Sequence, residues 1–255
     1  MMQSKPFHLE GKVVLVTGGS RGLGFEITRA LLEQKARVAI CGRKREGLEQ
    51  AKAELAAEDR LLAVQAHVAK EEEVERLFDA AVSHFGKLDV LINNVGMNLL
   101  TGSLIETELA VWQKIIDSNL TGAFLCSRRA AKLMREEKKG KIVNISSIAG
   151  TRAAPGMGVY GIAKAGIEMM TRVLALELSA YNIQVNAVAP GMVRTDFSKP
   201  FWSNEDILSQ AVKAIPLGRI ADPMDIVLPV LFLCSEGSDY ITGQTIMVDG
   251  GATAI

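Results

Sequence analysis

The sequence K-V-V-L-V-T-G-G-S-R-G-L-G spans residues 12–24 and changes character twice. Residues 13–16 are β-branched or aliphatic, which indicates a strand buried on both faces. Glycines follow at positions 18, 19, 22 and 24, and a helix is expected from residue 25 to residue 34. A tight glycine turn between a strand and a helix lets a phosphate approach the backbone with no Cβ in the way, and it points free helix N–H groups at that phosphate.

The glycine spacing departs from the best-known dinucleotide-binding pattern. Counted from Gly18 it is G-x-x-x-G-x-G rather than G-x-G-x-x-G. Because tight turns also use glycine where nothing binds, the cluster alone leaves a purely structural role open. The candidate phosphate-binding residues of this turn are Gly18, Ser20, Arg21, Gly22 and Leu23.

Length and composition favour one large α/β domain over residues 1–255. The chain is 48% hydrophobic, and its 29 basic and 29 acidic side chains give a net charge of zero. This balance gives no support to a nucleic-acid or acidic-membrane partner. Cys41, Cys126 and Cys234 lie far apart without metal-ligand spacing, so we expect reduced thiols, no metal site and a cytoplasmic location. Neither an apolar leader nor a run of transmembrane length is found.

Predicted strands and helices alternate along the chain. Strands are expected at residues 13–16, 36–41, 61–66, 88–92, 141–145, 183–188 and 244–248. Helices are expected at residues 25–34, 44–57, 71–85, 106–138 (bent near Gly122), 159–180 and 223–234, whereas residues 196–215 look irregular and are interpreted as a substrate lid. This rhythm predicts an α/β fold: a single doubly wound (Rossmann) domain with a seven-stranded parallel sheet flanked by helices on both faces.

Ligands of such sheets bind beyond the carboxyl ends of the strands. Small or polar residues follow five of the predicted strands, at positions 18–23, 41–43, 93–96, 146–147 and 190–195. Five strand ends of this kind favour a cofactor cleft more strongly than any one of them does.

The end of the second predicted strand bears on the choice of cofactor. A unit that binds NAD places an acid there for the ribose 2′-hydroxyl, but this chain has Arg43 followed by Lys44 and Arg45. An arginine binds a 2′-phosphate, and Arg21 can approach the same group from the glycine turn. We therefore predict NADP(H), the alternative being a solvated basic start of a helix.

Tyr160 and Lys164 stand four residues apart at the start of a predicted helix and so project from the same face. A nearby ammonium favours a phenolate, so we expect Lys164 to lower the pKa of Tyr160 toward the range that proton transfer needs. Ser147, thirteen residues before Tyr160, supplies a hydroxyl for a carbonyl oxygen that gains negative charge. In isolation each of these residues also has an ordinary structural interpretation.

Taken together, the motifs resemble the short-chain dehydrogenase/reductase family. The resemblance runs from about residue 9 to residue 251 and rests on the order and spacing of T-G-G-S-R-G-L-G (17–24), N-N-V-G (93–96), Asn119, S-S (146–147), Y-G-I-A-K (160–164) and P-G-M-V-R-T (190–195).

The resemblance implies roles for individual residues. Tyr160 would be the acid–base group, Lys164 would lower its pKa and bind the nicotinamide ribose, and Ser147 would orient the substrate oxygen. Asn119 would hold a water that links Lys164 to solvent, although its position also suits a polar residue that stabilises a kink. Asn94 and Gly96 would lie along the adenosine half, and the nicotinamide and pyrophosphate would be lined by Pro190, Gly191, Val193 and Thr195.

Two positions depart from the family pattern. Val95 replaces the usual alanine of N-N-A-G, and His67, followed by Val68, stands where an aspartate often contacts the adenine amino group. We place His67 and Val68 at the adenine, where the imidazole would hydrogen-bond or stack.

The substrate pocket is expected to draw on apolar or soft side chains, which favours an aliphatic or aromatic carbonyl. These are Met97, Ile148, Met157, Met192 and Trp202, although the methionines also suit core gaps. The first hypothesis is an NADP(H)-dependent ketone or aldehyde reductase, because residues 196–251 resemble carbonyl/retinal reductases of the peroxisomal type, without their terminal tripeptide.

Three further interpretations are carried forward. A 3-oxoacyl-(acyl-carrier-protein) reductase would need a basic surface, for which Lys138, Lys139 and Lys141 are the candidates. A non-catalytic NADP-binding regulator on the same fold is the alternative from another class. The family resemblance also implies a homotetramer paired through residues 107–138 and 159–180, where the apolar face with Ile167, Met170, Leu174 and Leu178 suits either an interface or a core.

Overall fold

The computed structural model describes residues 7–254, apart from the side chains at positions 58 and 200, and within this range the predicted strands form one parallel sheet. The strands are β1 Val13–Thr17, β2 Arg37–Gly42, β3 Leu61–Gln65, β4 Val90–Asn93, β5 Gly140–Ile145, β6 Ile183–Pro190 and β7 Thr245–Val248. Their order is β3-β2-β1-β4-β5-β6-β7. The order reverses between β1 and β4, and ligands of doubly wound sheets bind at such a reversal.

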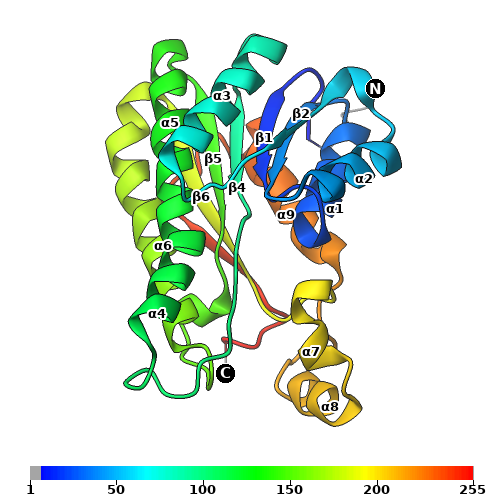
Figure 1. Cartoon of the computed structure of the whole chain (residues 1–255), viewed down its shortest axis with the longest axis vertical. Coiled ribbons are helices and arrows are strands. Elements are labelled where there is room, and N and C mark those ends of the chain that lie inside the picture. The colour runs from blue at the N-terminus through cyan, green and yellow to red at the C-terminus, as the bar shows by residue number, and fades with distance from the viewer. Residues whose placement is uncertain (1–6, 255) are drawn as a thin grey trace.

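Helices cover both faces of the sheet (Figure 1). One face carries α1 Gly22–Glu33, α2 Arg45–Leu55 and α9 Pro223–Cys234, and the other carries α3 Glu71–Phe85, α5 Gly122–Glu137 and α6 Gly158–Leu178. The fully buried strand β1 shows why. Val14 and Val16 pack into the core beneath α1 and α9, whereas Val13 and Leu15 pack beneath α3 and α5. The predicted doubly wound fold is confirmed.

The long helical stretch before β5 is interrupted where a bend was expected. Helix α4 (Leu109–Ile116) passes into the π-helical turn η2 (Asp117–Thr121), and α5 begins at Gly122. A Cβ on Gly122 would lie 2.7 Å from Cγ2 of Val68, so only glycine lets this helix lie against the chain beyond β3. The π-helical turn brings Asn119 into the interior, where it is 1% exposed.

The lid segment, defined here as residues 196–215, is helical, so the expectation of irregular structure is wrong. It contains the 3-10 turn η5 (Asp196–Ser198), α7 (Lys199–Trp202) and α8 (Glu205–Lys213). The side chain of Asn204 caps α8 by accepting from the N–H groups of Asp206 and Ile207 at 3.0 and 3.1 Å. Figure 1 shows α7 and α8 standing apart from the layered body, at one end of the sheet.

Shorter turns complete the described chain. They are the 3-10 turns η1 Glu58–Arg60, η3 Ile148–Gly150, η4 Ser179–Tyr181 and η6 Glu236–Ser238. Across residues 7–254, none of the helices combines the length and the apolar character that crossing a bilayer requires.

Candidate active site

The glycine turn after β1 is fixed to the chain beyond β4. The side-chain Nδ2 of Asn94 donates to the main-chain oxygens of Thr17 and Gly18 at 3.0 and 3.3 Å, while the Thr17 hydroxyl accepts from Asn94 N at 3.0 Å. Gly18 has φ of 68°, and a Cβ on Gly24 would lie 2.3 Å from the Gly18 oxygen. The Asn94 amide is therefore committed to shaping this turn, which was not its expected role.

The same turn has the groups that a dinucleotide phosphate needs. Arg21, the residue that precedes α1, makes no side-chain cap, and the first turn of the helix contains no acid. The N–H groups there are consequently not occupied by a side chain, and the helix dipole favours an anion. Gly22 has φ of 55°, and a Cβ on it would meet nothing within 4 Å. The residues present fit a pyrophosphate.

Two arginines lie near the end of β2. Arg43 directly follows the strand and is exposed, as is Arg21, and within residues 7–254 neither forms a salt bridge. The Ser20 hydroxyl lies 3.1 Å from the place that a Cβ on Gly42 would take, which sets the glycine turn against the end of β2. A hollow of about 340 Å³ opens beside Ser20 and Arg21. The end of the strand thus carries Arg43 and lacks the acidic residue that is expected of a unit that binds NAD.

Lys164 is held at the carboxyl end of β5. It is 3% exposed, and its Nζ donates to the main-chain oxygen of Ile145 at 2.8 Å. Burial lowers the pKa of Lys164 to about 8, because desolvation penalises the ammonium. Nζ lies 5.5 Å from the centre of the Tyr160 ring, so the two predicted partners do meet on one face of α6.

Tyr160 differs from expectation in its acidity. Burial raises the pKa of its phenol to about 12, against a smaller opposite effect of a hydrogen bond with Ser147. The expected lowering of this pKa by Lys164 is wrong for this arrangement, since the ammonium donates to the Ile145 oxygen instead. A phenol of this kind keeps its proton at neutral pH.

Ser147 reaches Tyr160 because the turn after β5 lies directly on α6. Its hydroxyl accepts from Ala149 N at 3.2 Å and caps the 3-10 turn η3. A Cβ on Gly150 would lie 2.9 Å from the Lys164 main-chain carbon and 3.0 Å from Ala165 N. Glycine at this position therefore sets the distance between Ser147 and the helix that carries the tyrosine and lysine.

Asn119 joins the site, but its side chain has structural partners. Its Nδ2 donates to the main-chain oxygens of Ile115 and Met97, each at 2.8 Å, and its Oδ1 accepts from Met97 N at 3.2 Å. The amide thus holds the chain after β4 against the π-helical turn. This agrees with the kink-stabilising alternative, and the expected water at Asn119 stays a prediction.

Gly96 lies at the catalytic end of the cleft. A Cβ on it would be 3.2 Å from Asn119 Oδ1 and 3.5 Å from Lys164 Nζ. Gly96 thus lies close to Asn119 and Lys164, and its expected position along the adenosine half stays a prediction.

The residues after β6 lead from the sheet to the lid segment. Gly191 N donates to Val248 O at 3.0 Å, and Val193 pairs with Ala221. Thr195 caps η5, and its main-chain oxygen accepts from Trp202 Nε1 at 2.9 Å. Pro190 ends β6 itself. This stretch consequently anchors the lid segment at the carboxyl edge of the sheet.

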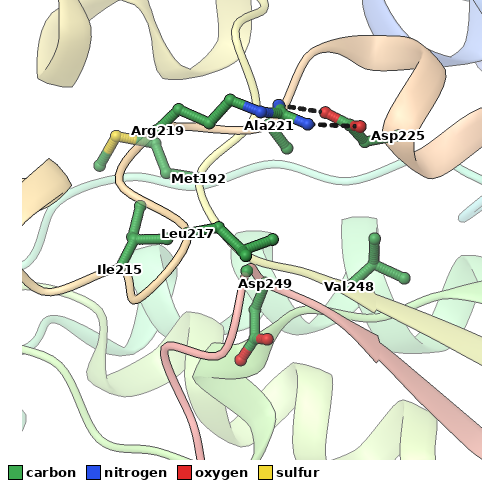
Figure 2. A pocket seen from close by; sticks show the side chains of 9 residues that line it. Met192, Ile215, Leu217, Arg219, Ala221, Asp225, Val248 and Asp249 are labelled. Carbon is green, nitrogen blue, oxygen red and sulfur yellow. Dashed lines mark hydrogen bonds and ion pairs between the residues drawn. The ribbon is translucent and has the colours of Figure 1, made fainter.

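The expected substrate residues separate into two groups. Met157 packs in a small cluster with Tyr160 and Ile115, beside the catalytic groups. Met192 and Trp202 pack instead with the lid segment. Met192 also lines a cavity of about 140 Å³ at the base of the lid, with the Arg219–Asp225 ion pair at its edge (Figure 2). None of the candidate catalytic residues Ser147, Tyr160 and Lys164 lines that cavity.

His67 and Val68 follow β3, as expected. His67 is half-buried, and its ring accepts a hydrogen bond from Ala69 N at 3.2 Å. Val68 is buried and packs against Gly122.

Glu168 was missed near the site, whereas Phe197 belongs to the lid segment that was expected to contribute to the substrate pocket. The ring of Phe197, from the lid segment, has its centre 6.5 Å from that of Tyr160. Glu168 is 4% exposed and accepts from Ser146 Oγ at 2.9 Å. Its spacing of four residues from Lys164 was the available sequence signal, whereas nothing in the sequence placed Phe197 over the tyrosine.

Gly150→Ala tests whether the contact between η3 and α6 positions Ser147. The added Cβ meets main-chain atoms that cannot move aside, so η3 must shift and carry Ser147 with it. We expect kcat for carbonyl reduction to fall roughly tenfold to 100-fold. Gly158→Ala is the matched control, because its Cβ meets only Leu104 side-chain atoms at 3.5 Å or more. Equal activity of the two variants would contradict the assignment.

The buried ammonium makes stability depend on pH with a definite sign. Between pH about 8 and 10.5 the unfolded chain keeps a proton that folded Lys164 has lost, so stability must rise with pH in this window. Between pH 7.5 and pH 9.5, the free energy of unfolding measured in urea should rise by about 2 kcal/mol more for the wild type than for Lys164→Met. A flat or falling difference would show that the ammonium is not desolvated.

Comparisons with known proteins agree with this geometry. A family model described as enoyl-(acyl carrier protein) reductase matches residues 18–253. Human dehydrogenase/reductase SDR family member 4 is 36% identical over 95% of this chain and 88% of its own length. The 3-oxoacyl-[acyl-carrier-protein] reductase of Synechocystis is 39% identical over 95% of this chain and 97% of its own.

A solved structure shares the whole fold. The crystal structure of a putative gluconate dehydrogenase from Agrobacterium tumefaciens superposes with a TM-score of 0.93 at 37% identity, covering 98% of each chain. These relatives are named as dehydrogenases and reductases, and the family uses a nicotinamide cofactor, which favours an enzyme over a non-catalytic regulator. This chain belongs to the short-chain dehydrogenase/reductase family and is an oxidoreductase that acts on CH–OH/C=O groups.

Proposed function

We propose that the protein is an NADPH-dependent reductase of apolar ketones or aldehydes. The observation that carries this proposal is the placement of the Tyr160 phenol between the Ser147 hydroxyl and the buried Lys164 on the carboxyl edge of the sheet. A protonated phenol gives a proton to an oxygen that becomes negative, and the proposed use of NADPH favours the reductive direction.

Residues of the protein supply the proton for the carbonyl oxygen and stabilise the negative charge that develops on it. A bound nicotinamide supplies the hydride to the carbonyl carbon. Ser147 donates a hydrogen bond to the carbonyl oxygen as negative charge develops there, and Tyr160 transfers its phenolic proton to that oxygen. Lys164 then stabilises the phenolate through its ammonium and binds the nicotinamide ribose. Asn119 acts as a positioning residue that holds the chain around Met97 beside the lysine.

The surroundings of Tyr160 favour an apolar substrate. Val159, Ile115 and Met157 pack around it, and Phe197 approaches from the lid segment. We propose that residues 196–215 act as the substrate lid, since a separate apolar cluster joins them to Met192 and Ala252 at the sheet edge. A 3alpha-hydroxysteroid dehydrogenase from Mediterraneibacter gnavus, 36% identical over 96% of this chain, is a relative whose name indicates a large apolar substrate.

The second candidate is a 3-oxoacyl-(acyl-carrier-protein) reductase, which the Synechocystis relative and the description of the family model favour. The positions of the three lysines that were expected to form a basic surface argue against this candidate. Lys141 is 8% exposed and pairs with Asp239 at 2.7 Å. Lys138 and Lys139 precede β5 and so lie at its amino end, opposite the edge that carries Ser147. A carrier bound there would not reach the catalytic groups.

A homotetramer in the cytoplasm is part of the proposal. Ile167 and Leu178, two residues of the expected pairing face, are buried in the monomer. Apolar side chains that remain exposed on the long helices are better candidates for that face, and they are Phe124 on α5 and Ile162, Met169, Val173 and Leu176 on α6. The three cysteines are free and buried, as suits a reducing compartment.

Arg43→Ala tests the choice of cofactor. Loss of the guanidinium removes the charge-assisted hydrogen bonds to a 2′-phosphate, so we expect the preference for NADPH over NADH in Kd to fall roughly tenfold or more. Lys52→Ala removes a charge from the other end of α2 and should leave the preference unchanged. An unchanged preference in Arg43→Ala would refute the 2′-phosphate assignment.

A substrate panel tests the reaction. With NADPH oxidation followed by absorbance, aromatic ketones and medium-chain aldehydes should give a kcat/KM at least about tenfold above that of a 3-oxoacyl thioester. A mock purification without the protein provides the blank. Preference for the thioester would favour the second candidate, and failure with every carbonyl compound would overturn the proposed activity.

A further inference from the structure

Glu168 is a buried acid that no step of the proposed chemistry uses. It stands one helical turn after Lys164 on α6 and is 4% exposed. Burial raises the pKa of its carboxyl, while a hydrogen bond from Ser146 and the charge of Arg172 act in the opposite direction. Because burial has the largest effect, this position disfavours the charged form, so Glu168 contributes little to the stability of the fold.

The carboxylate lies against both ends of the short segment 146–150, which carries Ser147. At the first end, Ser146 Oγ donates to Glu168 Oε1 at 2.9 Å. At the other end, a Cβ on Gly150 would lie 2.7 Å from the same oxygen, so the turn η3 packs directly against it. Ser147 caps η3 from within the segment. A shift of Glu168 Oε1 would therefore be passed on to the serine.

Ser146 has two acceptors within reach, and the carboxylate is the better one. The hydroxyl has a single proton, and its alternative acceptor is the main-chain oxygen of Lys164 at 3.3 Å. The bond to the carboxylate is shorter and charge-assisted, so it takes the proton. Without an acceptor at position 168, the hydroxyl would turn to the Lys164 oxygen, one helical turn earlier. The end of β5 would then be attached to α6 at a different place.

We propose that Glu168 is a positioning residue, whose carboxylate oxygen holds segment 146–150 so that the Ser147 hydroxyl stays within reach of Tyr160. Three consecutive residues, 145–147, are then each bonded to a different turn of α6. Side chains four residues apart share one face of a helix, so the three bonds fix the end of β5 along the helix as well as against it. The role of Glu168 rests on the proposed function, in which Ser147 and Tyr160 act on the carbonyl oxygen.

The test measures hydride transfer in a single turnover, with NADPH and the best carbonyl compound of the substrate panel, beside urea unfolding of each variant. Glu168→Met keeps an unbranched side chain of similar length but has no strong acceptor, so we expect the transfer rate to fall roughly tenfold or more. The Kd for NADPH should stay within about threefold. Stability should not fall, because an apolar group replaces a buried charge. A residue that only supported the fold would lower stability instead.

Three further variants separate the hydrogen bond from other effects. Glu168→Gln keeps an oxygen that accepts from Ser146, so the rate should stay within about threefold of the wild type. Ser146→Ala removes the same bond from its other end and should slow transfer about as much as Glu168→Met. The double variant should be no slower than either single variant, because both remove one interaction. Glu177→Met removes an exposed acid of the same helix as the matched control and should change neither rate nor stability.

Wild-type rates in Glu168→Met and Ser146→Ala would overturn the inference, as would a Glu168→Gln variant as slow as Glu168→Met or a double variant in which the two effects multiply. If Glu168→Met does not fold, Ser146→Ala and Glu168→Gln decide the question. Tyr160→Phe is measured alongside. A slow Tyr160→Phe next to wild-type rates at positions 146 and 168 overturns the role of Glu168 alone, whereas a wild-type rate in Tyr160→Phe overturns the proposed function itself.

Discussion

The structure depends on keeping one ammonium group out of water. Lys164 lies in the interior, and the oxygen that accepts from it is the last main-chain carbonyl of β5. A buried charge must be partnered, so the end of this strand and the start of α6 are held in one relative position. The turn between them inherits that restraint, because Gly150 lies against the main chain of Lys164. Ser147 and Tyr160 meet as a result.

Side-chain hydrogen bonds also hold the part of the structure where the cofactor is proposed to bind. The glycine turn after β1 is pinned by the Asn94 amide, which belongs to the neighbouring strand end. The reversal of strand order lies between these two strands, so one asparagine joins the halves of the sheet at the point where a dinucleotide would cross it. Asn119 makes a similar connection, because its side-chain amide holds Met97 against the π-helical turn. Side-chain amides thus connect strand ends that the sheet alone leaves as separate loops.

Sequence patterns predicted those parts of the structure that residues close together in the sequence determine. Buried strands such as β1 consist of β-branched and other aliphatic residues, and the glycines mark the turn after it, so the fold and the main strand ends followed directly. Long-range contacts were less accessible. The apolar face of α6 with Ile167 and Leu178 was left open between an interface and a core, and both residues are buried, because apolar character alone does not distinguish the two. The helices of the lid segment were missed because proline and aromatic residues hid the cap at Asn204. The direction of the pKa shift of Tyr160 was predicted with the wrong sign, since the effect of burial outweighs that of the hydrogen bond with Ser147.

The central claim is that the phenol of Tyr160 supplies the proton that accompanies hydride transfer at this edge of the sheet. Stopped-flow measurement of a single turnover with Tyr160→Phe addresses it most directly, because removing one oxygen leaves the packing of the ring in place. The account predicts that the rate of NADPH oxidation by a ketone falls by about 100-fold or more, while the Kd for NADPH stays within about threefold. A variant that transfers hydride at nearly the wild-type rate would contradict it.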